Sequence, residues 1–269
     1  MKDRASAETF GALHRGADIL ILPNAWDAAS AAIMADAGAK AVATSAAAVA
    51  WVHGYPDGGV LPMASLLATT EAMVRVAGIP VSVDIEGGYT DDLEIVGETF
   101  RKVINSGVAG INLEDGRRTP ASHARKIELA RKAADKEGVP LFINARIDVF
   151  LKGLAEGETA FEETIRRANL YRTAGASGIF VPGPREEEAI RRLASAIQLP
   201  LNVAIRPGLP AAARLQELGV RRVSSAGAPF RAAYATLAKT IEAFLRDGDP
   251  NAFGSGAELR GSLNARFGG

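Results

Sequence analysis

Short apolar runs rich in β-branched residues recur along the whole chain, and each is followed by a longer stretch rich in alanine, glutamate and arginine with helical spacing. The eight runs are Ile19–Ala25, Ala39–Ala46, Ile79–Asp84, Val108–Leu113, Val139–Asn144, Ser177–Val181, Leu199–Ile205 and Val220–Ser224. Glycine or proline introduces several of them and indicates where the preceding helix ends. This alternation predicts βα units in a parallel sheet, and eight such units can close a (β/α)8 barrel.

A length of 269 residues fits one barrel or two ordinary domains, but the regular recurrence argues against two unrelated domains. An open doubly wound sheet is the other arrangement of such units. The first run leads into residues 23–27, Pro-Asn-Ala-Trp-Asp, where a dinucleotide-binding sheet has a glycine-rich turn. We therefore expect an α/β fold, a single (β/α)8 TIM-barrel domain over residues 1–269. Residues 247–269 are expected to form a C-terminal arm, with either a further helix at Ala257–Phe267 or a frayed end.

The composition excludes several classes of function. Lysine plus arginine and aspartate plus glutamate each number 31, so no overall positive field attracts nucleic acid or an anionic membrane. The chain has no cysteine, which excludes disulfides, thiolate zinc sites and a thiol nucleophile. No apolar run is long enough to span a bilayer. We expect a soluble, cytoplasmic protein with neither a nucleic acid nor a membrane as partner.

Acidic residues dominate the ends of the third and fourth expected strands. Asp84 and Glu86 follow the third strand, and Glu114 and Asp115 follow the fourth. Side chains at the C-terminal ends of barrel strands meet at one mouth, and neighbouring carboxylates repel unless a cation or proton lies between them. Such an oxygen-only set suits Mg²⁺, with Mn²⁺ as the alternative. The competing interpretation, strongest for Asp115, is that these acids cap helices or form surface ion pairs.

Arg146 ends the most apolar of the expected strands. A guanidinium beside acids can bind a substrate carboxylate in bidentate fashion, or it can simply neutralise Asp148 or Glu114. The segment Ser224–Pro229 is a weaker candidate for the phosphate-binding turn that many barrels place after their last strands. Its small residues are equally explained by close packing of the last helix.

Five motifs carry a resemblance to a known family: Thr44-Ser45, then Gly54-Tyr55-Pro56-Asp57, Asp84-Ile85-Glu86-Gly87-Gly88-Tyr89, Asn112-Leu113-Glu114-Asp115 and Asn144-Ala145-Arg146-Ile147-Asp148. In order and spacing they resemble the isocitrate lyase and phosphoenolpyruvate mutase superfamily, from about residue 22 to about residue 245. The resemblance implies a (β/α)8 barrel. It also implies a homotetramer, a dimer of dimers, in which the eighth helix is exchanged between neighbouring subunits.

The resemblance also implies roles for individual residues. Asp84 would bind the metal directly, and Asp57, Glu86 and Glu114 would bind it through waters. Ser45 and the backbone amides of Ala46 and Ala47 would hold one substrate carboxylate. Asp84 and Arg146 would also contact the substrate, and Arg146 would stabilise the developing enolate. Asn202 would contact a remote carboxylate. Trp26 would line the pocket as an aromatic wall, unless it is simply a packed core residue. The catalytic set is expected to comprise Arg146, Tyr55 and Glu114.

Three departures from the family pattern limit the choice of reaction. Residues 116–123 replace the cysteine-containing loop of the lyases that cleave isocitrate or methylisocitrate, so no thiol can carry the proton. The same segment offers few counterparts to the gating loop of the mutases and phosphonopyruvate hydrolases. Val181-Pro182-Gly183 stands where many lyases have a glutamate. The proton must be carried by Tyr55, by a metal-bound water or by a residue of the 116–123 segment.

The favoured hypothesis is a Mg²⁺-dependent carbon–carbon lyase, similar to 2-methylisocitrate lyase or oxaloacetate decarboxylase. It would act on a small 2-hydroxy or 2-oxo di- or tricarboxylic acid through a metal-stabilised enolate. The alternatives are an oxaloacetate decarboxylase, a phosphoenolpyruvate mutase or phosphonopyruvate hydrolase, and a non-catalytic protein that binds 2-oxo acids.

Overall fold

The computed structural model describes residues 3–253 and 262–268. Its nine strands are all parallel and form one sheet in the order β1-β9-β8-β7-β6-β5-β4-β3-β2. Their bounds are β1 Leu20–Leu22, β2 Asn24–Ala25, β3 Val42–Thr44, β4 Val81–Asp84, β5 Gly110–Glu114, β6 Phe142–Arg146, β7 Gly178–Phe180, β8 Leu201–Ala204 and β9 Arg222–Ser224. The expected barrel is confirmed, because all eight predicted strands are present.

The barrel is nearly closed because its first predicted strand is split at Pro23. β1 pairs with β9 and β2 pairs with β3, so the two edges of the sheet are joined by this single proline. Proline has no backbone N–H and interrupts the ladder of hydrogen bonds, whereas its carbonyl still accepts from Ala43 N–H at 2.9 Å. The continuous segment from Leu20 to Ala25 thus supplies the strands at both edges of the sheet.

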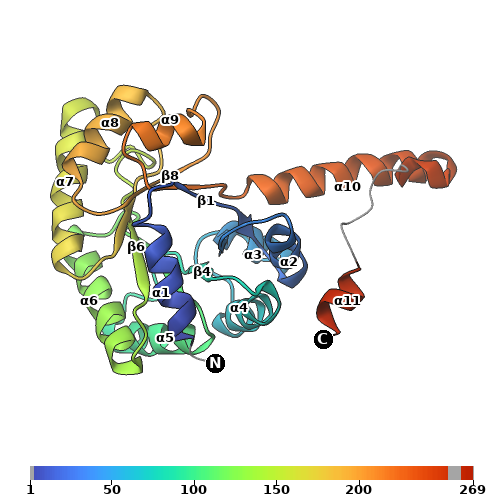
Figure 1. Cartoon of the computed structure of the whole chain (residues 1–269), viewed down its shortest axis with the longest axis horizontal. Coiled ribbons are helices and arrows are strands. Elements are labelled where there is room, and N and C mark those ends of the chain that lie inside the picture. The colour runs from blue at the N-terminus through green and yellow to red at the C-terminus, as the bar shows by residue number, and fades with distance from the viewer. Residues whose placement is uncertain (1–2, 254–261, 269) are drawn as a thin grey trace.

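Helices surround the sheet (Figure 1). Their bounds are α1 Arg4–Leu13, α2 Ala28–Asp36, α3 Ala46–Val52, α4 Met63–Ala77, α5 Leu93–Asn105, α6 Pro120–Glu137, α7 Gly157–Thr173, α8 Glu187–Ala196, α9 Ala212–Glu217, α10 Ala228–Asp247, the 3₁₀ helix η1 Pro250–Phe253 and α11 Leu263–Phe267. Polar side chains at the N-caps start several of them, including Ser45 before α3 and Thr119 before α6. Left-handed glycines end α4 and α6 at Gly78 and Gly138. None of the helices in the described ranges is long and apolar enough to cross a bilayer.

The amino-terminal end of the barrel is covered by α1. Phe10 packs edge-on against Phe142 at the start of β6, and the His14 ring stacks on the same phenylalanine with centroids 3.8 Å apart. The interior above is unusually polar, with Asn112, Asn144 and a fully buried Arg222. Asn112 Oδ1 accepts hydrogen bonds from Asn144 and Arg222. The opposite, carboxyl-terminal end is left open.

The last long helix, α10, extends away from the barrel (Figure 1). Only Phe230 near its start is buried, while Tyr234, Leu237, Ile241 and Leu245 are exposed. Helix α10 precedes the arm expected at residues 247–269, which stays a prediction. Of the helix predicted at Ala257–Phe267, the part from Leu263 is present as α11, and residues 257–261 lie outside the described ranges. Helix exchange between subunits stays a prediction.

Candidate active site

A cavity of about 270 Å³ opens at the carboxyl-terminal ends of the strands. It is lined by Asn24, Ser45, Ala46, Ala47, Asp57, Gly58, Asp84, Glu86, Asn112, Glu114, Arg146, Lys152, Phe180, Ser224, Ala226 and Gly227. Eight residues predicted for the site are therefore together: the four acids Asp57, Asp84, Glu86 and Glu114, the arginine Arg146, and Ser45, Ala46 and Ala47. The structure brings them to one mouth from distant parts of the sequence.

The turn after β4 carries two of the acids. Asp84 is the last residue of the strand, and its backbone N–H donates to Thr44 Oγ1 at 2.8 Å. Glu86 N–H donates to Asp84 Oδ1 at 2.9 Å. Glu86 has a φ of 49°, a left-handed conformation that is costly for a residue with a side chain. This strained turn places both carboxylates against the same cavity.

The acids raise one another's pKa values. Burial raises the pKa of Asp84, and the nearby Asp57 raises it further. Burial also raises the pKa of Glu86, with added contributions from Asp84 and Asp57. The pKa of Glu114 is raised to about 7, mainly by burial and then by Asp84 and Asp148, against the opposing effect of Arg146. The cavity therefore favours protons or other cations beside these carboxylates.

The net charge of the side chains that line the cavity indicates which ligand charge the cavity favours. Four carboxylates and two cations, Arg146 and Lys152, line the cavity, which leaves two negative charges in excess when all are ionised. The four carboxylates offer only oxygen atoms as metal ligands, and oxygen is the ligand atom that Mg²⁺ and Mn²⁺ prefer. Within residues 3–253 and 262–268, however, no group of three or more histidine, aspartate or glutamate side chains is arranged as a metal cluster. The donor type and excess charge fit a divalent cation held mostly through waters.

Arg146 is engaged by two acids. Its Nη1 lies 2.8 Å from Glu114 Oε2, and its Nε and Nη2 donate to the two carboxylate oxygens of Asp148 at 2.7 and 3.2 Å. The guanidinium also lies over the Phe180 ring, 5.7 Å from its centroid. Each of the three guanidinium nitrogens thus has an acidic partner. Arg146 thus forms the ion pairs with Glu114 and Asp148 that the sequence offered as the alternative to binding a substrate carboxylate.

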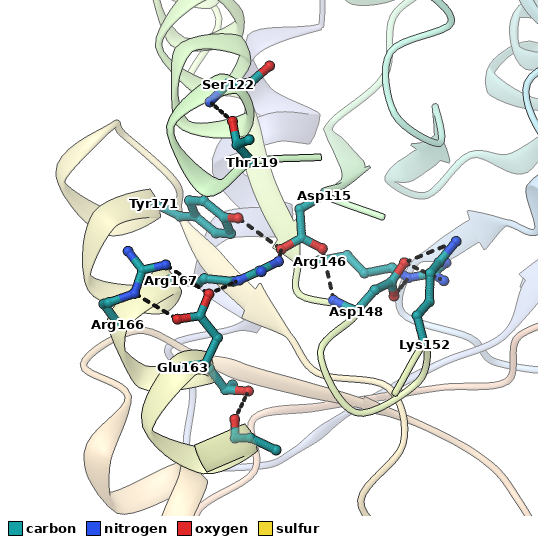
Figure 2. Close-up of polar contacts among 12 residues, drawn as sticks. Asp115, Thr119, Ser122, Arg146, Asp148, Lys152, Glu163, Arg166, Arg167 and Tyr171 are labelled. Carbon is teal, nitrogen blue, oxygen red and sulfur yellow. Dashed lines mark hydrogen bonds and ion pairs between the residues drawn. The ribbon is translucent and has the colours of Figure 1, made fainter. Parts of the chain in front are cut away.

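A buried network behind the cavity holds the ends of β5 and β6 together (Figure 2). Asp115 is fully buried and accepts from Asp148 N–H at 2.9 Å, Arg167 Nη1 at 2.7 Å and the Tyr171 hydroxyl at 2.8 Å. Asp115 is not the cap of the following helix, because Thr119 caps α6. Through Asp148, the network reaches Arg146, so Asp115 is a positioning residue.

Residues 116–119 form a short turn between β5 and α6. Helix α6 begins at Pro120, and Arg118 Nε donates to Asp91 Oδ1 at 2.6 Å. Lys126 Nζ, fully buried, donates to the same Asp91 oxygen and to the carbonyls of Gly87 and Thr90. The turn is therefore tied to the segment after β4 and contributes none of the residues that line the cavity.

Three predicted site residues do not line the cavity. Tyr55 is 38% exposed on the segment between α3 and α4 that also carries Asp57. Trp26 packs edge-on against Phe230 at the start of α10. Asn202 is buried in β8 inside the barrel, where its Nδ2 donates to Ser224 Oγ at 3.4 Å. Tyr55 can carry a proton only if its segment moves, and Asn202 reaches the cavity only through Ser224.

Sequence reasoning missed four residues of the lining, Gly58, Asn112, Lys152 and Phe180, whereas Ser224, Ala226 and Gly227 belong to the segment considered for phosphate binding. Lys152 lies six residues after Arg146, in the turn after β6, and a search limited to strand ends does not reach it. Asn112 points into the barrel from inside a strand. Its burial among apolar neighbours was the available signal, since a buried amide needs a specific partner.

The comparisons with known proteins agree with this geometry. The family model described as phosphoenolpyruvate phosphomutase matches residues 10–245. The chain belongs to this family, within the isocitrate lyase and phosphoenolpyruvate mutase superfamily. Its named relatives are lyases, decarboxylases and mutases.

The similar proteins differ in their named reactions. An uncharacterised protein of Mycobacterium tuberculosis is 35% identical over 90% of each chain. The 2-methylisocitrate lyase of Bacillus subtilis is 30% identical over 72% of this chain and 65% of its own length. A solved structure from Burkholderia cenocepacia, provisionally described as a phosphonomutase, is 42% identical, has a TM-score of 0.85 and is matched over 88% of this chain and 99% of that one. The family is thus established, and the individual reaction is open.

Proposed function

We propose that this protein is a divalent-cation-dependent carbon–carbon lyase that acts on a small 2-oxo or 2-hydroxy acid. The observation that carries the proposal is the cavity with two excess negative charges at the carboxyl-terminal mouth of the barrel. Active sites of such barrels are built at this end. A divalent cation held by these carboxylates would offset their charge and let an anionic acid bind beside them.

In this proposal, Asp84 would hold Mg²⁺ or Mn²⁺ directly, and Asp57, Glu86 and Glu114 would hold it through waters, as the family resemblance implies. When bound, the cation supplies Lewis-acid polarisation of the substrate's carboxylate and adjacent oxygen. Ser45 and the amides of Ala46 and Ala47, at the start of α3, bind one substrate carboxylate, as N–H groups at a helix start do for anions. These three residues line the same cavity as the acids.

Arg146 stabilises the negative charge that appears on the substrate as the bond breaks. Its position is fixed by Asp148 and Glu114, so its charge needs no reorganisation during the reaction. The electron pair of the broken bond remains on one fragment as an enolate. The other fragment leaves as a carbonyl compound, after its hydroxyl has given a proton to water, or as carbon dioxide in a decarboxylation. The proton that the enolate then takes up comes from water or from Tyr55, since no thiol exists in the chain.

Oxaloacetate decarboxylation is the second candidate. It needs the same chelation and the same charge stabilisation, but no mobile loop to protect two organic fragments. The tied turn at residues 116–119 favours it, and relatives of this name belong to the family. Separate measurement of carbon dioxide and of glyoxylate or pyruvate distinguishes decarboxylation from cleavage into two acids.

The test is turnover of a panel of 2-hydroxy and 2-oxo acids by the purified protein, with Mg²⁺ and after removal of metal by a chelator. We expect at least one acid to be cleaved only with the metal, and the activity of Asp84→Asn to fall by at least about 100-fold. Asp135→Asn, at an exposed position of α6 outside the cavity lining, is the matched control. Tight metal-dependent binding of these acids without any product would support the binding protein instead.

We also propose that α10 packs on a second copy of the chain, as one contact of a homotetramer. A barrel helix normally covers the outside of its strand, but α10 projects outward with Tyr234, Leu237, Ile241 and Leu245 exposed along one face. The outer side of β1 correspondingly keeps Ile21 62% exposed in an apolar groove with Leu13 and Met34. Exchange of α10 between two copies would cover both surfaces.

A further inference from the structure

The two cations that line the cavity differ in their freedom to bind a ligand. Arg146 has an acidic partner at each guanidinium nitrogen. Lys152 Nζ lies 3.9 Å from Glu114 Oε1 and 3.8 Å from Asp148 Oδ2, which is too far for hydrogen bonds. The Lys152 side chain is 34% exposed. Among the described residues that line the cavity, Lys152 is therefore the cation whose donors are available.

We propose that Lys152 binds the second carboxylate of a dicarboxylic substrate and thereby determines the substrate class. This inference rests on the function proposed above. One carboxylate of the acid occupies the site at Ser45 and the α3 amides. The other, at the far end of a short chain, meets the Lys152 ammonium, which is a mobile point charge with three donors.

The turn after β6 supports this role. Lys152 N–H donates to the Asp148 carbonyl at 2.9 Å, so the turn that presents the ammonium begins at a residue fixed by the Asp115 network. Figure 2 shows the Lys152 side chain beside Asp148 and Arg146. The backbone of the turn is thus anchored, while the end of the side chain remains free to meet a ligand.

Gly116 lies beside Lys152 and Glu114 at the mouth of the cavity. A Cβ at this position would lie 3.9 Å from Lys152 Nζ and 3.8 Å from Glu114 Oε1. Gly116 also has a φ of 56°, which residues with side chains rarely adopt. Arg118, in the same turn, is paired with Asp91. Of the two cations near Gly116, Lys152 is therefore the one that can receive the distal anion.

The experiment compares two acids that differ in the distal carboxylate, L-malate and L-lactate. Their binding is measured by isothermal titration calorimetry with saturating Mg²⁺, for the unaltered chain and for Lys152→Gln, Lys152→Arg and the surface control Lys102→Gln. The unaltered chain and the control should bind malate at least about tenfold more tightly than lactate. Lys152→Gln should lose most of this preference for malate, while its affinity for lactate stays within about twofold of that of the unaltered chain. Lys152→Arg keeps the positive charge and should keep the preference for malate.

The outcomes separate this inference from the proposed function. If the unaltered chain and Lys152→Gln bind malate equally well in the presence of the metal, the role of Lys152 is overturned and the proposed function is not affected. Tighter binding of phosphonopyruvate than of malate would overturn the assignment to dicarboxylates. If neither hydroxy acid binds the unaltered chain in a metal-dependent way, the inference about Lys152 is overturned, whereas the proposed function fails only if the panel of 2-oxo and 2-hydroxy acids gives no metal-dependent turnover. Circular dichroism and the thermal midpoint of each variant check that the fold is intact.

Discussion

At the scale of single residues, the acids of the site could be predicted from the sequence, but the groups that hold them could not. The end of a strand can be located from its apolar run, so Asp84 and Glu114 were found by position alone. Asp115 and Arg167 are 52 residues apart and lie in elements with no shared pattern. Their contact is created by the packing of α7 beside β5 and β6, which only the folded structure reveals.

The Asp115 network makes a prediction about stability. Asp115→Ala leaves the Asp148 N–H and the Tyr171 hydroxyl without their buried acceptor and removes one partner of Arg167. We expect the free energy of unfolding in urea to fall by about 3 kcal/mol or more. The matched control is Glu98→Ala, which breaks an exposed pair with Arg101 and should cause little change. Equal effects of the two substitutions would contradict the positioning role of Asp115.

At the scale of elements, the strand pattern predicted the order of the barrel, and its errors lie at the ends of the strands. β5 and β6 run through Glu114 and Arg146, one and two residues beyond the predicted ends. An apolar run does not show the backbone pairing of the polar residue that follows it. The division of the first strand at Pro23 was missed for a related reason, because the run from Ile19 to Ala25 does not show that its two halves pair with different neighbours.

Helix α1, which covers the base of the barrel, makes the fold sensitive to acid. Burial, and then the charge of Arg222, lower the pKa of His14 to about 3 from 6.5. The unfolded chain binds a proton at His14 below pH 6.5 and the folded chain does not, so this contribution to stability is complete above pH 6.5 and is lost as the pH falls towards 3. His14→Phe keeps a ring against Phe142 and removes the titration.

We therefore expect His14→Phe to lose less stability than the unaltered chain between pH 6.5 and pH 4, as measured by urea unfolding at each pH. Part of the acid sensitivity should persist, because burial lowers the pKa of His123 in the same way. Parallel pH profiles for the two proteins would show that His14 is not responsible.

At the scale of the whole molecule, the sequence predicted one barrel and an arm, but not the direction of α10. Its apolar face shows that the helix packs against something. The pattern cannot show whether the covering surface belongs to the same chain or to another copy. The projecting helix and the open groove beside Ile21 favour another copy.

Charged residues on the face of α10 should therefore break the assembly. We expect the unaltered chain to have a mass of several subunits by light scattering, and the double variant Leu237→Arg, Ile241→Arg to approach the 28.1 kDa of one chain. Lys239→Ala, a change at an exposed position between them, should leave the mass unchanged. A monomeric unaltered chain would contradict the exchange of α10.

The central claim, that the acids at the barrel mouth bind one divalent cation, is tested most directly by titrating Mn²⁺ into the protein and recording the electron paramagnetic resonance of the free ion. We expect one site per chain, an affinity at least about 100-fold lower for Asp84→Asn, and an affinity about tenfold lower for Glu86→Gln, whose carboxylate acts through water. Asp135→Asn, an exposed change on α6, should bind Mn²⁺ as the unaltered chain does. Absence of stoichiometric binding, or an unchanged affinity in Asp84→Asn, would contradict the account.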